Sequence, residues 1–64
     1  MHDKRETRDI GKGLQATVVD EFTSCRWFIF RDEGRVRTVL EEKRARNPEE
    51  AWKAVHREKR KWLR

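Results

Sequence analysis

Residues 25–31 and 35–41 have the sequences CRWFIFR and RVRTVLE, and the sequence DEG joins them at residues 32–34. Aromatic and β-branched residues dominate both segments, which is typical of β-strands. Asp32, Glu33 and Gly34 fit a type I turn in which the glycine adopts the left-handed conformation. The sequence therefore predicts a β-hairpin over residues 25–41.

The length of this turn sets which side chains share a face of the hairpin. A three-residue turn pairs Arg31 with Arg35, and we prefer this register. One face, which is apolar, then consists of Phe28, Phe30, Val36 and Leu40. The other face consists of Trp27, Ile29, Arg31, Arg35, Arg37 and Val39. A two-residue turn at Glu33 and Gly34 would instead place Arg37 beside Phe30.

A helix is predicted from Pro48 nearly to Arg64. Asn47 is a typical N-cap, proline is favoured at the first helical position, and Glu50 has the spacing of a capping box. One side of this helix is apolar and consists of Ala51, Trp52, Val55, Trp62 and Leu63. We expect its stripe of Trp52, Val55 and Trp62 to pack on the Phe28/Phe30 face of the hairpin.

Residues 14–22 complete the predicted fold as a first strand, in which Leu14, Ala16 and Val18 share a face. Residues 1–13 alternate in charge without an apolar period and predict a mobile arm. The fold class is therefore α+β: a three-stranded antiparallel meander packed against one C-terminal helix. We expect a single domain over residues 14–64 and a flexible arm over residues 1–13.

The composition limits the function. Of the 64 residues, 34% are hydrophobic and 45% are charged, so the core is too small for an ordinary buried catalytic cleft. The single cysteine, Cys25, cannot form an intrachain disulfide, which favours a reducing, cytoplasmic location. The apolar run Trp27–Phe30 is too short to span a bilayer, and we expect no membrane partner.

Neither catalysis nor metal binding is predicted. His2, Cys25 and His56 are scattered over the arm, a strand and the helix, without the spacing of zinc ligands. Cys25 and the neighbouring Ser24 have no local base to activate them. We expect no enzyme activity, no cofactor and no metal.

The net charge of +5 and its distribution predict binding to a nucleic acid. On the helix, the spacing of four, three and four residues aligns Lys53, Arg57, Arg60 and Arg64. On the sheet, the predicted binding residues are Trp27, Arg31, Arg35 and Arg37. Arginine binds phosphate and guanine, and an exposed tryptophan stacks on bases. These two surfaces point away from each other, so we do not expect them to contact one short duplex segment together.

The predicted function is thus a small basic regulatory or accessory protein that binds nucleic acid, DNA before RNA. The predicted layout is similar to that of the DNA-binding domains of phage integrase arms and plant ethylene-response factors, although no motif of either family is matched. The alternative is a protein-interaction module, such as a phage- or plasmid-type inhibitor or adaptor. It would bind an acidic host protein through Trp27, Ile29 and Val39. A weak homodimer is a variant of this alternative.

Overall fold

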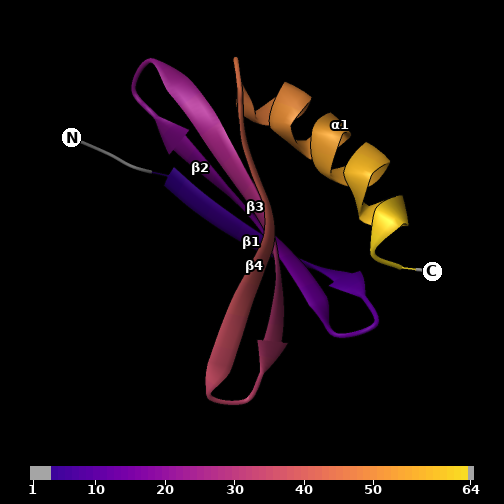
Figure 1. Cartoon of the computed structure of the whole chain (residues 1–64). Helices are drawn as coiled ribbons and strands as arrows, with labels where there is room; N and C mark the ends of the chain where they lie inside the picture. The colour runs from indigo at the N-terminus through magenta and orange to yellow at the C-terminus, as the bar shows by residue number, and fades with distance from the viewer. Residues whose placement is uncertain (1–3, 64) are drawn as a thin grey trace.

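The computed structural model describes residues 4–63, which form one antiparallel sheet and one helical segment (Figure 1). The strands follow one another in the order β1-β2-β3-β4. Their bounds are Lys4–Gly11, Leu14–Glu21, Ser24–Glu33 and Val36–Ala45. Helix α1 covers Pro48–Glu58 and continues into a short 3-10 turn, η1, over Lys59–Lys61. The α+β class and the C-terminal helix are confirmed, but the meander has four strands and not three.

Strand β1 occupies residues that we expected in the mobile arm. Its side chains from Lys4 to Asp9 are exposed, so the sequence of β1 lacks the alternation of apolar and polar residues that would predict a strand. Backbone pairing with β2 holds it in place, and the Thr7 and Thr17 hydroxyl oxygens lie 2.8 Å apart across the pair. Lys12 and Gly13 both have positive φ, as a tight turn between β1 and β2 requires. The glycines around Lys12 therefore mark a hairpin and not the end of an arm.

The β3–β4 hairpin exists as predicted, but its register differs from both alternatives. The turn consists of Gly34, at φ 67°, and Arg35, so that Arg31 pairs with Thr38 and not with Arg35. The pairing shifts between Ile29 and Phe30, where Leu40 is the extra residue of a bulge. Glycine with positive φ at the first turn position allows this two-residue turn.

The face of β3 that packs on α1 is also the reverse of our prediction. Trp27 and Ile29 are buried against the helix, together with Ala16 and Val18 of β2. Both faces of β3 are apolar, so the alternation alone does not choose between them. The choice follows from β2: Val18 pairs with Trp27 and Ala16 pairs with Ile29, which places them on the β2 face that we predicted to be apolar.

The start of α1 is as predicted. The Asn47 side chain accepts a hydrogen bond of 2.9 Å from the backbone N–H of Glu50, which confirms the N-cap. The reciprocal bond of a capping box is absent among the hydrogen bonds of residues 4–63. Trp52 and Val55 are buried on the sheet, whereas Trp62 lies beyond η1 and is half-buried.

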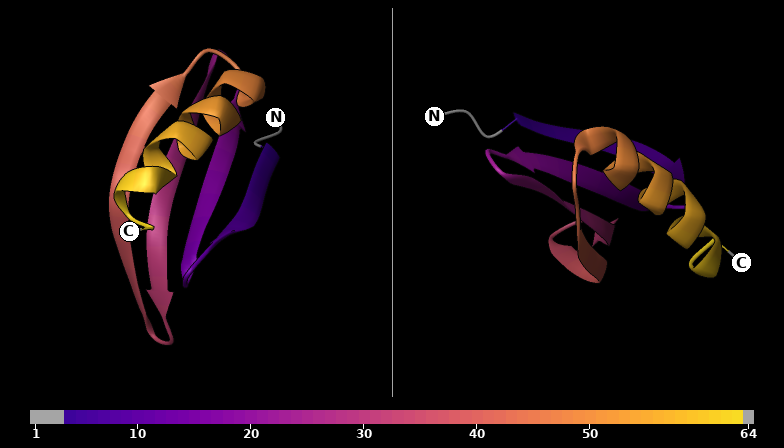
Figure 2. Two further views of the ribbon diagram at one scale, coloured as in Figure 1. Left: turned by 90° about the vertical axis from the view of Figure 1, so that its right-hand side faces the viewer. Right: turned by 90° about the horizontal axis from the view of Figure 1, so that it is seen from above.

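The helix covers one face of the sheet and leaves the other uncovered (Figure 2). The end of the β3–β4 hairpin extends past the helix, which is clearest at the bottom of Figure 1. The small residues Ala16, Cys25 and Ala51 give Trp27 and Trp52 room between the two layers. This packing supplies the core and fixes the uncovered face as a rigid surface.

Candidate functional site

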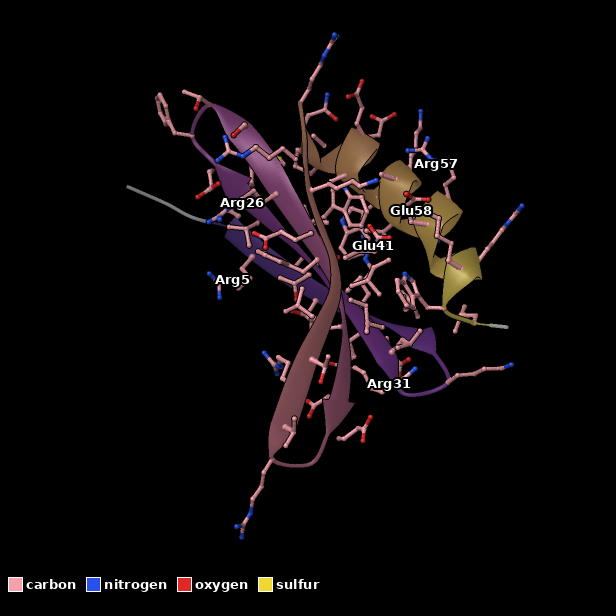
Figure 3. The ribbon with its side chains drawn as sticks, viewed as in Figure 1. Arg5, Arg26, Arg31, Glu41, Arg57 and Glu58 are labelled. Carbon is pink, nitrogen blue, oxygen red and sulfur yellow. The ribbon has the colours of Figure 1, made fainter. Side chains whose placement is uncertain are left out.

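The sheet face opposite α1, which we call the open face, is the most distinctive surface of the molecule. Arg5 and Arg26 lie on this side of the sheet, whereas Arg57 lies on the helix (Figure 3). A shallow hollow of about 230 Å³ crosses all four strands there. It is lined by Arg5, Thr7, Thr17, Val19, Arg26, Phe28, Phe30, Arg37 and Val39. The open face therefore combines an apolar centre with three arginines.

Arginine side chains lie over the aromatic rings of the open face. The guanidinium carbon of Arg37 is 4.5 Å from the centroid of the Phe30 ring, and that of Arg26 is 5.9 Å from the Phe28 ring. Within residues 4–63, no helix or loop covers this face, yet Phe30 is only 3% exposed. Cation–π contacts of this kind contribute about 0.5–1 kcal/mol at exposed sites. The two guanidinium groups are thus held in place on a rigid sheet.

Carboxylates neutralise part of this positive charge. Arg26 makes two hydrogen bonds to Glu21, at 2.9 and 3.1 Å, and lies 3.7 Å from Glu42. Arg37 lies 3.6 Å from Asp32. A single solvent-accessible pair such as Arg37–Asp32 is typically worth about 0–1 kcal/mol, so an anionic ligand can replace Asp32 at low cost. The two-bond contact of Arg26 with Glu21 is stronger. Within residues 4–63, no ion pair involves Arg5.

Of the four sheet residues predicted to bind, only Arg37 lies on the open face. Trp27 is 1% exposed in the core and is not available for stacking, because its strand face packs on α1. Arg31 lies on the helix side of the sheet, 3.9 Å from Glu33, and Arg35 lies in the turn. Ile29 is buried and Val39 belongs to the open face, so the predicted Trp27/Ile29/Val39 cluster does not exist.

The predicted basic side of the helix is present in part. Lys53, Arg57 and Arg60 are exposed, although Arg60 lies on η1 and not on the α-helix. Lys53 lies 3.6 Å from Glu49, one turn earlier. Arg64 lies outside the described residues.

Sequence reasoning missed Arg5, Arg26 and Arg44. Arg26 has the same parity as Phe28 and Phe30, so it would have been grouped with them if the open face had been identified. Arg44 lies directly opposite Arg26 on β4. Arg5 belongs to a strand that has no apolar signal, so no pattern in the sequence indicates its place.

Two other parts of the molecule do not form a distinct site. Cys25 is buried with its thiol 3.5 Å from Asp20 Oδ1, and burial, followed by Asp20, raises the pKa of the thiol. A hollow of about 440 Å³ lies between β1 and the start of α1. Two cations, two carboxylates and three apolar residues line it: Lys4, Arg5, Glu6, Asp20, Val18, Pro48 and Trp52. Its mixed charge selects no class of ligand.

Among residues 4–63, no cluster of three or more histidine, cysteine or acidic side chains is arranged to hold a metal ion. The same part of the chain contains no helix of the length and apolarity that crossing a membrane requires. Comparison of the chain with protein-family models, curated proteins and solved structures gives no match.

Proposed function

We propose that the protein binds nucleic acid through the open face, with DNA as the first expectation and RNA as the second. The observation that carries this proposal is the pair of arginines held over Phe28 and Phe30 on an uncovered sheet. The net charge of +5 supports the same partner class. No catalytic role is part of the proposal.

The chemistry of the guanidinium group favours this ligand. Its planar donors form paired hydrogen bonds with phosphate oxygens or with the O6 and N7 atoms of guanine. An arginine that is already stacked on an aromatic ring loses less conformational freedom when it binds. Arg37 and Arg26 are both in this state, so less of their binding energy is spent on ordering the side chains.

The dimensions of the sheet favour contact through the β3–β4 hairpin. The major groove of B-DNA is about 12 Å wide and admits a two-stranded ribbon. Neighbouring strands lie about 4.8 Å apart, so the backbones of four strands alone span about 14 Å. The hairpin extends past the helix and carries Arg37, and it can enter a groove that is too narrow for the whole sheet.

Fluorescence anisotropy with a labelled duplex tests the proposal, with Arg37→Ala and Arg31→Ala as a matched pair. Both residues lie on exposed strand positions of the same hairpin, and each lies near one carboxylate, but they are on opposite faces. Both variants lose one positive charge. We expect Arg37→Ala to weaken binding about five- to tenfold and Arg31→Ala to weaken it less than twofold.

The affinity of the wild-type protein should also fall steeply between about 50 and 200 mM salt, as counterion release requires. Equal effects of the two substitutions would show that the open face has no special role. If the wild-type protein does not bind duplex DNA, single-stranded DNA or RNA at the lower salt, the proposal is wrong.

A protein partner is the second candidate function, and it now depends on a different residue. Phe22 is fully exposed at the β2–β3 turn, and the Trp27/Ile29/Val39 cluster that we predicted is not present. Large exposed aromatic side chains are frequent anchors of protein interfaces. Sedimentation velocity of the wild type and Phe22→Ser tests the homodimer: self-association that the substitution abolishes would support it, and a monomeric wild type would exclude it.

A further inference from the structure

A second basic hollow lies where the end of β4 meets the exposed flank of α1. It has a volume of about 270 Å³ and is lined by Arg44, Ala45, Glu50, Lys53, Ala54 and Arg57. We call it the β4-edge groove. All of its charged side chains are exposed, so a ligand can reach them from solvent.

The charge of the β4-edge groove is strongly positive. Its lining contains three cations and one carboxylate, Glu50. In the described part of the chain, neither Arg44 nor Arg57 belongs to an ion pair, and Lys53 is paired only with the well-exposed Glu49. Two arginines and one lysine thus line the groove without a strong internal partner, which favours an anionic ligand.

Arg44 connects this groove with the open face. It lies directly opposite Arg26 in the β3–β4 pairing, where like charges are mutually destabilising. Glu21 and Glu42 compensate Arg26, but no ion pair compensates Arg44 among residues 4–63. The positive surface therefore continues from the open face around the β4 edge to α1. This continuity differs from our expectation that the sheet and helix surfaces act on separate segments.

We propose that the β4-edge groove binds a backbone phosphate of the same nucleic acid that lies on the open face. This inference rests on the proposed function and adds a second contact to it. The guanidinium groups of Arg44 and Arg57 would each donate to the phosphate oxygens, and Lys53 would add a point charge. The nucleic acid backbone would then cross the β4 edge and run along the flank of α1.

The test compares two double variants that lose the same charge. Arg44→Ala/Arg57→Ala removes both guanidinium groups of the groove, and Lys12→Ala/Arg31→Ala removes two exposed cations that line neither the groove nor the open face. Anisotropy titrations with one labelled duplex over a series of salt concentrations give the log–log slope for each protein. Each lost phosphate contact reduces the magnitude of this slope by about 0.9. We expect a reduction of about 0.9 or more for the groove variant and of less than about half of that for the control.

Circular dichroism checks that both double variants keep the wild-type melting temperature, which the exposure of all four side chains predicts. Equal slopes for the groove and control variants would overturn the inference. The proposed function would still stand in that case if Arg37→Ala weakens binding. Absence of salt-dependent binding by the wild type would overturn the proposed function itself.

A second measurement separates a nucleic acid phosphate from free phosphate. The Nε–Hε signals of Arg44 and Arg57 are followed by NMR with the duplex and, separately, with inorganic phosphate at about 10 mM. We expect the duplex to shift these signals at low-micromolar concentrations. Inorganic phosphate should cause much smaller shifts. Equal shifts with phosphate alone would identify a small-anion site and overturn the assignment to the nucleic acid backbone.

Discussion

The Arg37 guanidinium carbon lies 4.5 Å from the centroid of the Phe30 ring, on the sheet face that α1 leaves uncovered. The guanidinium group lies over the face of the ring, and its Nη2 atom lies 3.6 Å from Asp32 Oδ2. This geometry favours one orientation of the guanidinium group on the open face. An oriented guanidinium group should contribute more to binding than a flexible side chain of the same charge.

Replacing Arg37 by lysine separates orientation from charge. Lysine keeps the positive charge but provides neither the planar stacking surface nor the paired donors. The five- to tenfold weakening expected for Arg37→Ala corresponds to about 1–1.4 kcal/mol of binding free energy. We expect Arg37→Lys to lose at least half of this amount. Anisotropy at one fixed salt concentration measures both variants. Wild-type affinity in Arg37→Lys would mean that charge alone matters.

Stacking of Arg37 and Arg26 on Phe30 and Phe28 also predicts which form of nucleic acid binds best. Single strands gain affinity mainly when their bases stack on accessible aromatic rings, at about 1–3 kcal/mol per base. The protein's own arginines already occupy these rings, and Phe30 is almost fully buried. We therefore expect a duplex to bind about tenfold more tightly than an unstructured strand of the same length. Competition titrations measure this ratio, and preferential binding of the single strand would contradict the prediction.

The two core tryptophans should matter for stability and not for binding. Trp27 is 1% and Trp52 8% exposed, and the Arg8 guanidinium carbon lies 4.0 Å from the Trp52 ring centroid. Replacing either tryptophan by alanine should cost about 3–5 kcal/mol, enough to unfold most of so small a domain. Phe22→Ala is the matched control, because this fully exposed aromatic side chain should change stability by less than about 0.5 kcal/mol. Urea unfolding followed by circular dichroism measures all three; a folded Trp52→Ala variant with the wild-type midpoint would exclude the packing of α1 on the sheet.

These results show which parts of the fold are predictable from the sequence. The start of α1 is predictable because its signals are local: Asn47 caps the first turn and Pro48 begins the helix. The structure confirms both roles. The β3–β4 hairpin likewise has a local signal in its apolar residues and glycine turn. The end of α1 at Glu58 has no such signal, because neither glycine nor proline follows it.

The errors arise where long-range packing decides the outcome. Trp27 and Phe28 are neighbours of similar apolar character, and only the pairing of β3 with β2 determines which of them faces α1. The bulge at Leu40 changes the pairing along β4, and it depends on contacts with the rest of the core. Strand β1 is charged and exposed, so its position depends on hydrogen bonds to β2 and not on its own composition. The site residues were predicted incorrectly for the same reason. The candidate site lies on the sheet face that does not pack on α1, and the sequence did not show which face this is.

The N-cap of α1 gives a prediction about a purely local interaction. The Asn47 side chain accepts a hydrogen bond from the Glu50 N–H at 2.9 Å, so Asn47→Ala leaves this N–H without its protein partner. We expect a loss of about 1 kcal/mol in the free energy of unfolding. Asn47→Asp should restore most of it, since aspartate caps a helix equally well and also favours the positive end of the dipole. Urea unfolding provides the measurement, and equal stabilities of the alanine and aspartate variants would exclude a capping role.

The attachment of α1 and η1 to β4 should weaken in acid. The Glu58 carboxylate accepts hydrogen bonds from Lys43 at 3.2 Å and Lys61 at 3.3 Å, and both lysines also lie within 4.0 Å of Glu41 (Figure 3). The hydrogen bond from Lys43, followed by that from Lys61, lowers the pKa of Glu58 below its ordinary value of 4.5. Between the lowered pKa and 4.5, the unfolded chain binds more protons than the folded one, so stability rises with pH in this window. The contribution is complete above pH 4.5 and is lost as the pH falls through the folded-state pKa.

Replacing Glu58 by glutamine removes this titration. We expect Glu58→Gln to be less stable than the wild type near neutral pH and to show a smaller loss of urea midpoint on acidification to about pH 3. The double variant Lys43→Gln/Lys61→Gln provides an independent check, because it leaves Glu58 in place but removes both cations that lower its pKa. Its acid profile should also become flatter. A wild-type profile in both variants would show that other carboxylates cause the acid sensitivity and that Glu58 does not stabilise the contact between α1 and β4.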